Sequence, residues 1–322
     1  MERVSTPEKF FQMFLALGGF VVFFAVVLFI VSRVRGRAQE PLTVAAFILP
    51  TMLMLAIGLI YPAVLTIKQS FQNANSTAFV GLENYATLFR EGEYQRVLAN
   101  TFIWVLLVPL AATAIGLIYA VLVDRTRTES LSKALVFIPM AISMVGASII
   151  WKFVYDYRPT KVPQIGLANQ ILKSLGFDTY QFLITDPWNT FFLIVVMIWI
   201  QAGFAMTVLS ASIKAIPDDI IEAAKLDGVS ALQMFRHITL PSIRPGMIVV
   251  LTTIAIGTLK VFDVVRTMTG GRFKTSVVAN EFYTQAFRYD NAGLGAALAV
   301  LLFILVIPII AYNISQLRKA AN

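Results

Sequence analysis

Few side chains of this 322-residue chain could carry out covalent or metal chemistry. Cysteine is absent and the one histidine is His237. This composition excludes a cysteine nucleophile, structural disulfides, thiolate metal sites and a zinc site of the H-E-x-x-H type. The sequence has no G-x-x-x-x-G-K-[ST] phosphate-binding loop, and its apolar segments contain no cluster of carboxylates. We therefore predict a protein that is not an enzyme, with no catalytic residues, no metal site and no cofactor of its own.

Two ionisable side chains inside a long apolar segment call for an explanation. Lys260 and Asp263 are three residues apart in it, where a charged side chain costs roughly 2.5 to 3.5 kcal/mol on insertion scales. At that spacing on one helix the two side chains can face and neutralise each other. The alternative is that this face lines a cavity through which a substrate passes. The residues alone leave both interpretations open.

The elements that position these residues are predicted to be membrane-spanning helices. The chain is 58% hydrophobic, with a mean hydropathy of +0.76, whereas soluble domains are about 45 to 50% apolar. Runs of about 20 apolar residues can cross a hydrocarbon core as helices, and a barrel would show short segments of alternating polarity instead. The predicted fold class is an all-α polytopic membrane protein. Its seven predicted spans are Phe10–Ser32, Leu42–Ile67, Leu98–Val123, Leu131–Tyr155, Trp188–Ile213, Gly246–Val265 and Ala292–Leu317.

The charges between the spans predict the orientation. The formal net charge is +8, but the basic residues lie in short stretches between apolar runs, which argues against nucleic acid as a partner. Charges before the first span cancel, whereas Arg33, Arg35 and Arg37 follow it. The positive-inside rule then places the N-terminus outside and the C-terminal tail in the cytoplasm. The segments predicted to be cytoplasmic are 33–40, 124–129, 214–245 and the tail with Arg318 and Lys319.

The segment 216–245 has the signals of two short helices joined by a turn. Pro217, followed by two aspartates, suits a helix start, and Gly228 suits a left-handed cap at its end. Ser230 begins a Ser-x-x-Gln capping box for a second helix, which Pro241 is expected to end. Any cytoplasmic connection of this length could fold into two such surface helices, so the pattern alone does not define a function.

The same segment resembles the EAA loop of binding-protein-dependent ABC importer permeases. The stretch EAAKLDGVSALQMFRHITLP matches that motif at Glu222, Ala223, Ala224, Gly228, Ile238, Leu240 and Pro241. Three further stretches are similar to the carbohydrate branch of this family, the maltose-type permeases. They are FVGLENYATLF (Phe79–Phe89), TLKVFDVVRTMTGG (Thr258–Gly271) and AGLGAALAVLLF (Ala292–Phe303). The resemblance implies an ABC type I importer permease fold over residues 41–322, preceded by an additional transmembrane helix and basic linker at residues 1–40.

The resemblance implies that the EAA loop, residues 216–245, docks to a separate ATPase. The coupling residues that it implies are Glu222, Ala223, Ala224, Asp227, Gly228, Leu240 and Pro241. Two alanines side by side would leave the first helix thin enough to lie in a groove of the partner, with Ile220, Ile221 and Leu226 as apolar contacts. Glu222 can meet a basic group of the ATPase.

The resemblance also implies the partners and the substrate. The complex would contain two ATPase subunits that bind ATP and Mg, a second homologous permease and an extracytoplasmic binding protein, in the cytoplasmic membrane of a bacterium. Its substrate would be a disaccharide or oligosaccharide. By region, the residues implied to line the sugar pathway are Gln201, Phe204, Thr258, Lys260 and Phe262.

One rival interpretation is an ion-gradient-driven secondary transporter. Such a transporter is expected to show internal repeats, interrupted spans or a membrane-centred acid that couples to the ion. In this sequence Asp263 is the one candidate for that acid. A membrane-embedded enzyme is the other rival, and the sequence shows no catalytic constellation for it.

Overall fold

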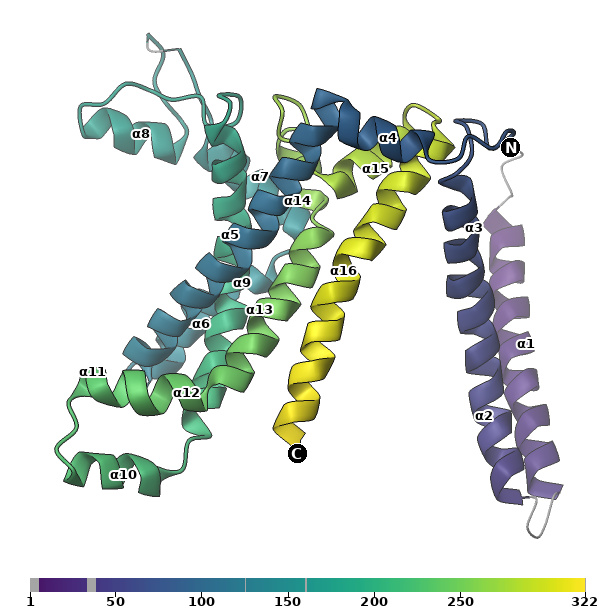
Figure 1. The fold of residues 1–322 in the computed structure, drawn as a ribbon, viewed down its shortest axis with the longest axis horizontal. Coiled ribbons are helices and arrows are strands. Elements are labelled where there is room, and N and C mark those ends of the chain that lie inside the picture. The colour runs from purple at the N-terminus through teal and green to yellow at the C-terminus, as the bar shows by residue number, and fades with distance from the viewer. Residues whose placement is uncertain (1–5, 34–38, 125, 160, 322) are drawn as a thin grey trace. The chain divides into compact units, whose positions relative to one another are not determined.

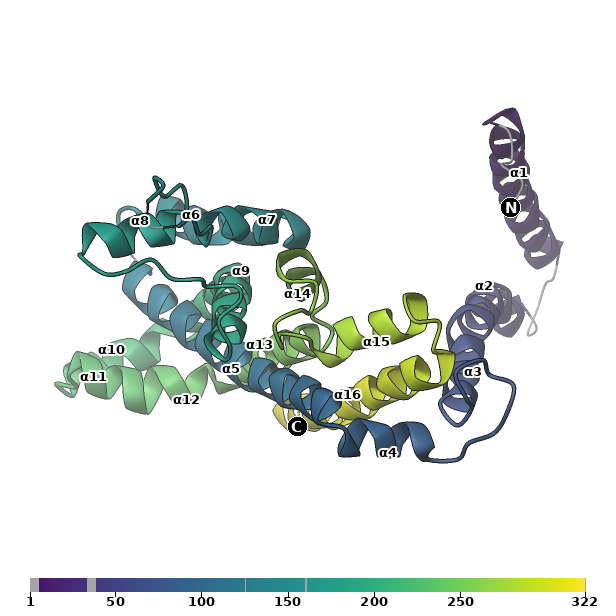
Figure 2. The ribbon, with the colours of Figure 1, turned by 90° about the horizontal axis from the view of Figure 1, so that it is seen from above.

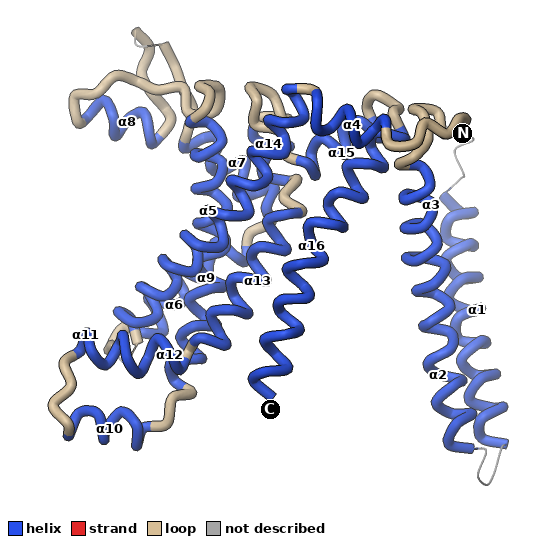
Figure 3. Tube along the Cα trace, in the orientation of Figure 1, coloured by secondary structure: helices blue, strands red, loops and turns tan. Residues whose placement is uncertain are grey.

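The computed structural model describes residues 6–33, 39–124, 126–159 and 161–321, and their regular structure is helical (Figure 1). Figure 3 shows no strand in these described ranges. Among these described residues, five helical segments are long and apolar enough to cross a membrane, or up to seven if each of two bent helix pairs is one span. The predicted all-α polytopic fold is confirmed. Arg35 and Arg37, in the predicted linker, lie outside the described residues.

The chain divides into two units, Met1–Leu65 and Thr66–Asn322, and the first contains two predicted spans. Its helices are α1 (Thr6–Arg33), α2 (Gln39–Leu55), the π-helix η1 (Ala56–Ile60) and the start of α3 (Tyr61–Gln69). In the segments Phe10–Phe29 and Thr43–Gln69 no residue of the most apolar window is buried. Apolar helices that bury nothing against protein are suited to face lipid, because their backbone groups are bonded within the helix.

The second unit is built around two long helices, α5 (Gly92–Val123) and α9 (Trp188–Lys214). Figure 2 shows α5 crossing α9, and α13 (Arg244–Leu259) packs against both. A Cβ atom added at Gly116 of α5 would lie 2.5 Å from the Cβ of Ala205 of α9. Small residues allow such close approach of membrane helices. The buried core of this unit includes Trp104 and Met197.

The predicted span Leu131–Tyr155 is broken in the structure. Helices α6 (Glu129–Ala141) and α7 (Met144–Val154) meet at 101°, so this predicted span consists of two helices and not of one. Ile142 leaves the helix with a ψ of 140°, and Ser143 caps α7 by accepting a hydrogen bond from the Gly146 amide at 3.0 Å. A serine that caps a new helix start is a local competitor to continued helix. The apolar run around it concealed this signal.

The short helices of the second unit gather at the two ends of the long ones (Figure 1). At one end are α4 (Glu83–Arg90), α8 (Leu167–Ser174), α14 (Asp263–Met268) and α15 (Val278–Phe287). At the other end are α10 (Asp218–Leu226), α11 (Ala231–Met234), the π-helix η2 (Phe235–Thr239) and α12 (Leu240–Ser242). The last helix, α16 (Ala292–Ala321), ends on the side of α10.

The loop from residue 269 to residue 277, which we call the α14–α15 loop, is fixed by side chains of the long helices. The amide nitrogen of Asn100 donates to the carbonyl oxygens of Lys274 at 2.7 Å and Ser276 at 3.0 Å. The amide nitrogen of Asn189 donates to the Phe273 carbonyl at 2.8 Å. Thr101 accepts a hydrogen bond from the Val278 amide at 2.9 Å. This loop is therefore bonded to α5 and α9, far away in sequence.

Candidate functional site

The EAA loop folds as a helical hairpin that projects from the end of α9 (Figure 1). Its first arm is α10, and its second arm runs from α11 through η2 to α12. At the turn, Gly228 has a φ of +74°, the Gly228 amide donates to the Lys225 carbonyl at 3.1 Å, and the Val229 amide donates to the Ala224 carbonyl at 3.2 Å. These two bonds define a Schellman motif. The predicted left-handed cap at Gly228 is confirmed.

The second arm begins with the predicted capping box. The backbone amide of Gln233 donates to the Ser230 hydroxyl. In return, the side-chain oxygen of Gln233 accepts from the backbone amide of Ser230 at 2.9 Å. Two backbone amides at this helix start are thereby satisfied, as the box requires. The turn and both helix ends around it are thus specified by residues of the EAA loop itself.

The expectation that Pro241 ends the second arm is wrong. The helix continues to Ser242 and breaks at Ile243, where α13 begins at an angle of 65°. Just before Pro241, the Leu240 amide bonds to the Phe235 carbonyl in a π turn. Proline has no amide hydrogen, and its ring clashes with the carbonyl four residues back in an α-helix. A wider π turn moves that carbonyl away, and η1 lies in the same position before Pro62.

The hairpin exposes apolar side chains to its surroundings. Leu226 is 90% exposed and Leu232 is 75% exposed, on either side of the turn. Glu222 is also exposed. These exposed side chains, on an element that projects from the helix bundle, are available for contact with another protein. The hairpin is therefore a candidate docking element.

The implied coupling residues do not all face the same way. Ala223, Asp227 and Pro241 are exposed and Leu240 is half-buried, whereas Ala224 is only 7% exposed. The expectation that both alanines form one thin outer face is therefore wrong, because Ala224 is buried. Ile221 also points inward and packs against the core.

Three of the implied pathway residues lie on α9 and α13, which pack against each other. The side-chain nitrogen of Gln201 is 3.9 Å from the position that a Cβ atom on Gly257 would take. Phe204 packs against the core beside it. Thr258 is fully buried, and its hydroxyl donates to the Ile254 carbonyl at 2.7 Å. Gln201 is thus directed at α13, while the hydroxyl of Thr258 is satisfied within its own helix.

The structure separates Lys260 from Asp263. Helix α13 ends at Leu259, Lys260 is its C-cap, and Asp263 begins α14. The prediction that both lie on one continuous helix is wrong, and no ion pair joins their side chains in the described part of the chain. Lys260 is exposed. Asp263 therefore does not neutralise the charge of Lys260.

An aromatic pair and a guanidinium pack together just after this break. The Phe262 ring centroid lies 5.1 Å from that of Tyr283 on α15, and the Arg266 guanidinium lies 4.7 Å above the Tyr283 ring. Arginine over an aromatic face is a favourable cation–π arrangement. Arg266 and Tyr283 were missed as neighbours of the pathway because they are on different helices.

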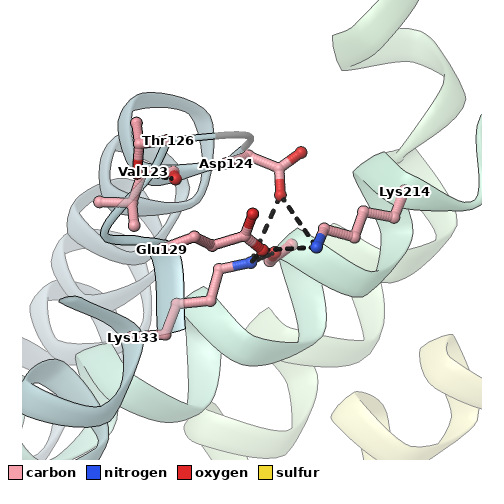
Figure 4. Close-up of polar contacts among 7 residues, drawn as sticks. Val123, Asp124, Thr126, Glu129, Lys133 and Lys214 are labelled. Carbon is pink, nitrogen blue, oxygen red and sulfur yellow. Dashed lines mark hydrogen bonds and ion pairs between the residues drawn. The ribbon is translucent and has the colours of Figure 1, made fainter. Parts of the chain in front are cut away.

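A group of charged side chains lies where the EAA loop begins (Figure 4). The sequence did not predict that these side chains contact one another. The group consists of Asp124, Glu129, Lys133 and Lys214, and we call it the charge cluster. The ammonium of Lys133 lies 2.6 Å from a Glu129 oxygen and 3.3 Å from an Asp124 oxygen. The ammonium of Lys214 contacts both carboxylates. Each of these residues lies near the end of a predicted span, and this position was the only sequence signal that the four side chains could meet.

The sequence matches a family of transport proteins. The model described as "Binding-protein-dependent transport system inner membrane component" matches residues 85–319. The osmoprotective compounds uptake permease protein GgtC of Synechocystis sp. is 45% identical over 84% of this chain and 98% of its own length. The alpha-glucoside transport system permease protein AglF of Rhizobium meliloti is 45% identical over 86% of this chain and 82% of its own length.

Two solved structures of a bacterial alginate ABC transporter have a similar fold. One covers 89% of this chain and 100% of its own, with a TM-score of 0.75 and 23% sequence identity. The other was solved in complex with an alginate pentasaccharide-bound periplasmic protein, and its TM-score is 0.73 at 23% identity. At this identity the likeness establishes the fold.

Proposed function

The chain belongs to the family of binding-protein-dependent transport system inner membrane components, and we propose that it is one permease subunit of a bacterial ATP-driven sugar importer. It forms half of the sugar pathway and couples to a separate ATPase through the EAA loop. The two relatives at 45% identity carry the names of an alpha-glucoside and an osmoprotective compounds permease. The name of the alpha-glucoside permease supports an alpha-glucoside as the substrate.

The observation that carries this proposal is the form of the EAA loop. It is a hairpin capped by its own residues, and it exposes Leu226, Leu232 and Glu222 outside the buried core. The chain has no phosphate-binding loop of its own. We expect ATP and its magnesium ion to be bound by two partner ATPase subunits, one of which docks on this hairpin.

Coupling follows from the way in which the hairpin joins the long helices. Its first arm follows α9 after three residues and its second arm leads into α13 through the break at Ile243. When the ATPase subunits close on ATP, the docked hairpin moves as a body and carries these two helices with it. The surface of α9 and α13 around Gln201, together with that of the second permease, then opens to alternate sides of the membrane.

The proposed orientation places the N-terminus outside and the EAA loop and C-terminal tail in the cytoplasm. Within the second unit, the end of α16 lies on the same side as the EAA loop (Figure 1), as this orientation requires. Residues 1–40 would then be an additional helix and linker before the permease domain at 41–322. The opposite end would receive an extracytoplasmic sugar-binding protein, and a second homologous permease would complete the pathway.

Uptake by the complex reconstituted in lipid vesicles tests the proposal. With ATP inside and a sugar-loaded binding protein outside, labelled alpha-glucoside should enter, and ionophores that collapse sodium and proton gradients should leave the rate unchanged. The same vesicles without ATP should not transport. Uptake that follows an imposed ion gradient without ATP would establish the secondary transporter instead.

The pathway residues need a separate test. Gln201→Ala should change the sugar preference or raise the KM for uptake, because the side chain is directed at α13. Gln95→Ala, which changes an exposed amide near the start of α5, is the matched control. Wild-type kinetics of Gln201→Ala for every tested sugar would remove Gln201 from the pathway.

A further inference from the structure

The charge cluster joins three segments of the chain at the point where the EAA loop begins. Asp124 is the C-cap of α5, Glu129 and Lys133 lie in the first turns of α6, and Lys214 is the last residue of α9. Lys133 also bonds to the hydroxyl of Ser210 on α9. Figure 4 shows both ammonium groups pointing at the two carboxylates. Two acids and two bases balance, so the cluster is neutral as a whole.

Burial makes the cluster costly to dismantle. The side chain of Asp124 is only 7% exposed, and those of Glu129 and Lys133 are each 22% exposed. Removing one partner of a buried ion pair leaves the other charge without compensation, which is far more unfavourable than losing an exposed pair. Lys214 is 51% exposed and contacts both acids. It is therefore the member that can be changed with the least effect on folding.

The cluster also borders the EAA loop. Asp124 lines a cavity of about 430 Å³ together with Lys225, Val229 and Met234 of that loop. Farther from the EAA loop along α9, a Cβ atom on Gly203 would lie 2.5 Å from the Val136 carbonyl of α6. At these contacts α9 cannot shift without pressing on α6. A displacement of the EAA loop can thus move α6 directly through α9, without the involvement of α13.

From α6 the route continues to the pathway. Helix α6 leads through the bend at Ser143 into α7, which packs against α14. The Lys152 ammonium of α7 lies 3.4 Å from the carbonyl oxygen of Thr267 on α14. The N-cap of α14 is Phe262, one of the implied pathway residues. The broken span α6–α7 therefore links the base of the EAA loop to the pathway.

We propose that the charge cluster transmits movement of the EAA loop to the broken span α6–α7, with Glu129, Lys133 and Lys214 as positioning residues for coupling. This proposal rests on the proposed function, because it needs an ATPase that moves the loop. None of these residues touches the sugar or ATP. Each acts by keeping α9, α5 and α6 in one arrangement while the loop moves, so that ATP hydrolysis and opening of the pathway stay linked.

The test compares three variants in the complete importer, assembled in lipid vesicles. Lys214→Met removes the charge, Lys214→Arg keeps it, and Glu129→Gln keeps the shape of the acid without its charge. Lys173→Met is the matched control, because Lys173 is an exposed lysine in the last turn of α8 at the opposite end of the bundle. The measurements are ATP hydrolysis without and with the sugar-loaded binding protein, and sugar molecules transported per ATP hydrolysed.

The expected result is a loss of coupling at an unchanged basal rate. Lys214→Met should lower both the stimulation of hydrolysis and the sugar transported per ATP by about fivefold or more. Lys214→Arg should restore both to within about twofold, because guanidinium also bonds to carboxylates. Glu129→Gln should show the same loss in smaller degree, and Lys173→Met should behave as wild type. A role in folding alone would lower the amount of assembled complex and leave the transport per ATP unchanged.

Wild-type coupling in both Lys214→Met and Glu129→Gln would overturn the proposal, and so would equal losses in Lys214→Met and Lys214→Arg. If Lys214→Met does not assemble, Glu129→Gln decides the question by the same criterion. These outcomes differ from a failure of the proposed function. In that case the wild-type complex itself would show no ATP-dependent uptake.

Discussion

The EAA loop and the α14–α15 loop lie at opposite ends of the second unit and are fixed in different ways. The EAA loop is shaped by near neighbours in sequence, through the Schellman motif at Gly228 and the capping box at Ser230. The α14–α15 loop is held by Asn100 and Asn189, on two distant helices. A loop held by its own bonds can move as one body, whereas a loop bonded to two long helices moves only with them. The difference fits a docking element at one end and a fixed frame at the other.

The largest effect that this comparison predicts is a loss of transport in Gly228→Val. A β-branched residue is a strained outlier at a φ of +74°, although no atom lies within 4 Å of the added Cβ position. The turn should open and misplace the two arms, while the membrane helices remain folded. ATP-dependent uptake by vesicles is expected to fall to the background of empty vesicles, at a normal amount of inserted protein.

Gly228→Asn is the control for this variant. Asparagine tolerates the left-handed conformation better than other side chains, so it should keep more transport than valine. If valine and asparagine reduce uptake equally, the left-handed turn is not what the EAA loop requires.

The second effect concerns stability at the other end. Asn100→Ala leaves the carbonyl oxygens of Lys274 and Ser276 without a buried donor, and an unsatisfied buried group costs about 1 to 3 kcal/mol. Thermal unfolding in detergent should therefore begin at a clearly lower temperature. Gln95→Ala removes an exposed amide that also donates to a backbone carbonyl, that of Phe89. Gln95→Ala should change the free energy of unfolding by no more than about 0.5 kcal/mol. Equal shifts of the unfolding temperature in the two variants would show that the bonds of Asn100 do not stabilise the α14–α15 loop.

A pair of alanine substitutions tests the two loops at the same backbone conformation. Gly271 has a φ of +79° and Gly228 a φ of +74°, but a Cβ atom on Gly271 would lie 2.3 Å from the side-chain nitrogen of the buried Asn280. Both variants carry the strain of a left-handed alanine, and only Gly271→Ala must also displace Asn280. We expect Gly271→Ala to be the less stable by about 1 kcal/mol. Equal free energies of unfolding would show that the α14–α15 loop yields as readily as the EAA loop.

The smallest change in stability is predicted for the exposed leucines of the hairpin. The double variant Leu226→Ser and Leu232→Ser should alter the free energy of unfolding by no more than about 0.5 kcal/mol, because both side chains are exposed. It should nonetheless retain less ATPase when the complex is purified through the permease. Leu175→Ser, at an exposed leucine near α8, should retain the ATPase normally. Full retention by the double variant would exclude these leucines from docking.

The sequence predicted what depends on neighbouring residues. Apolar runs gave the long helices, and the caps at Gly228 and Ser230 gave the hairpin, because these signals are local. The bend at Ser143 was missed since an apolar run surrounds it, and so was the end of α13 at Lys260. The charge cluster and the bonds of Asn100 depend on which helix ends meet in space. No periodicity in one sequence reveals such contacts.

The central claim is that an ATPase drives this permease through the EAA loop, and Glu222→Lys tests it most directly. The measurement is ATP hydrolysis by the purified complex, stimulated by the sugar-loaded binding protein. Glu222 is exposed on α10, so the variant should insert and fold normally. Reversal of its charge should weaken binding of the ATPase, since losing one partner of a buried interfacial charge pair costs about 2 to 5 kcal/mol. The account predicts that stimulated hydrolysis and uptake are lost, and wild-type levels of both would contradict it.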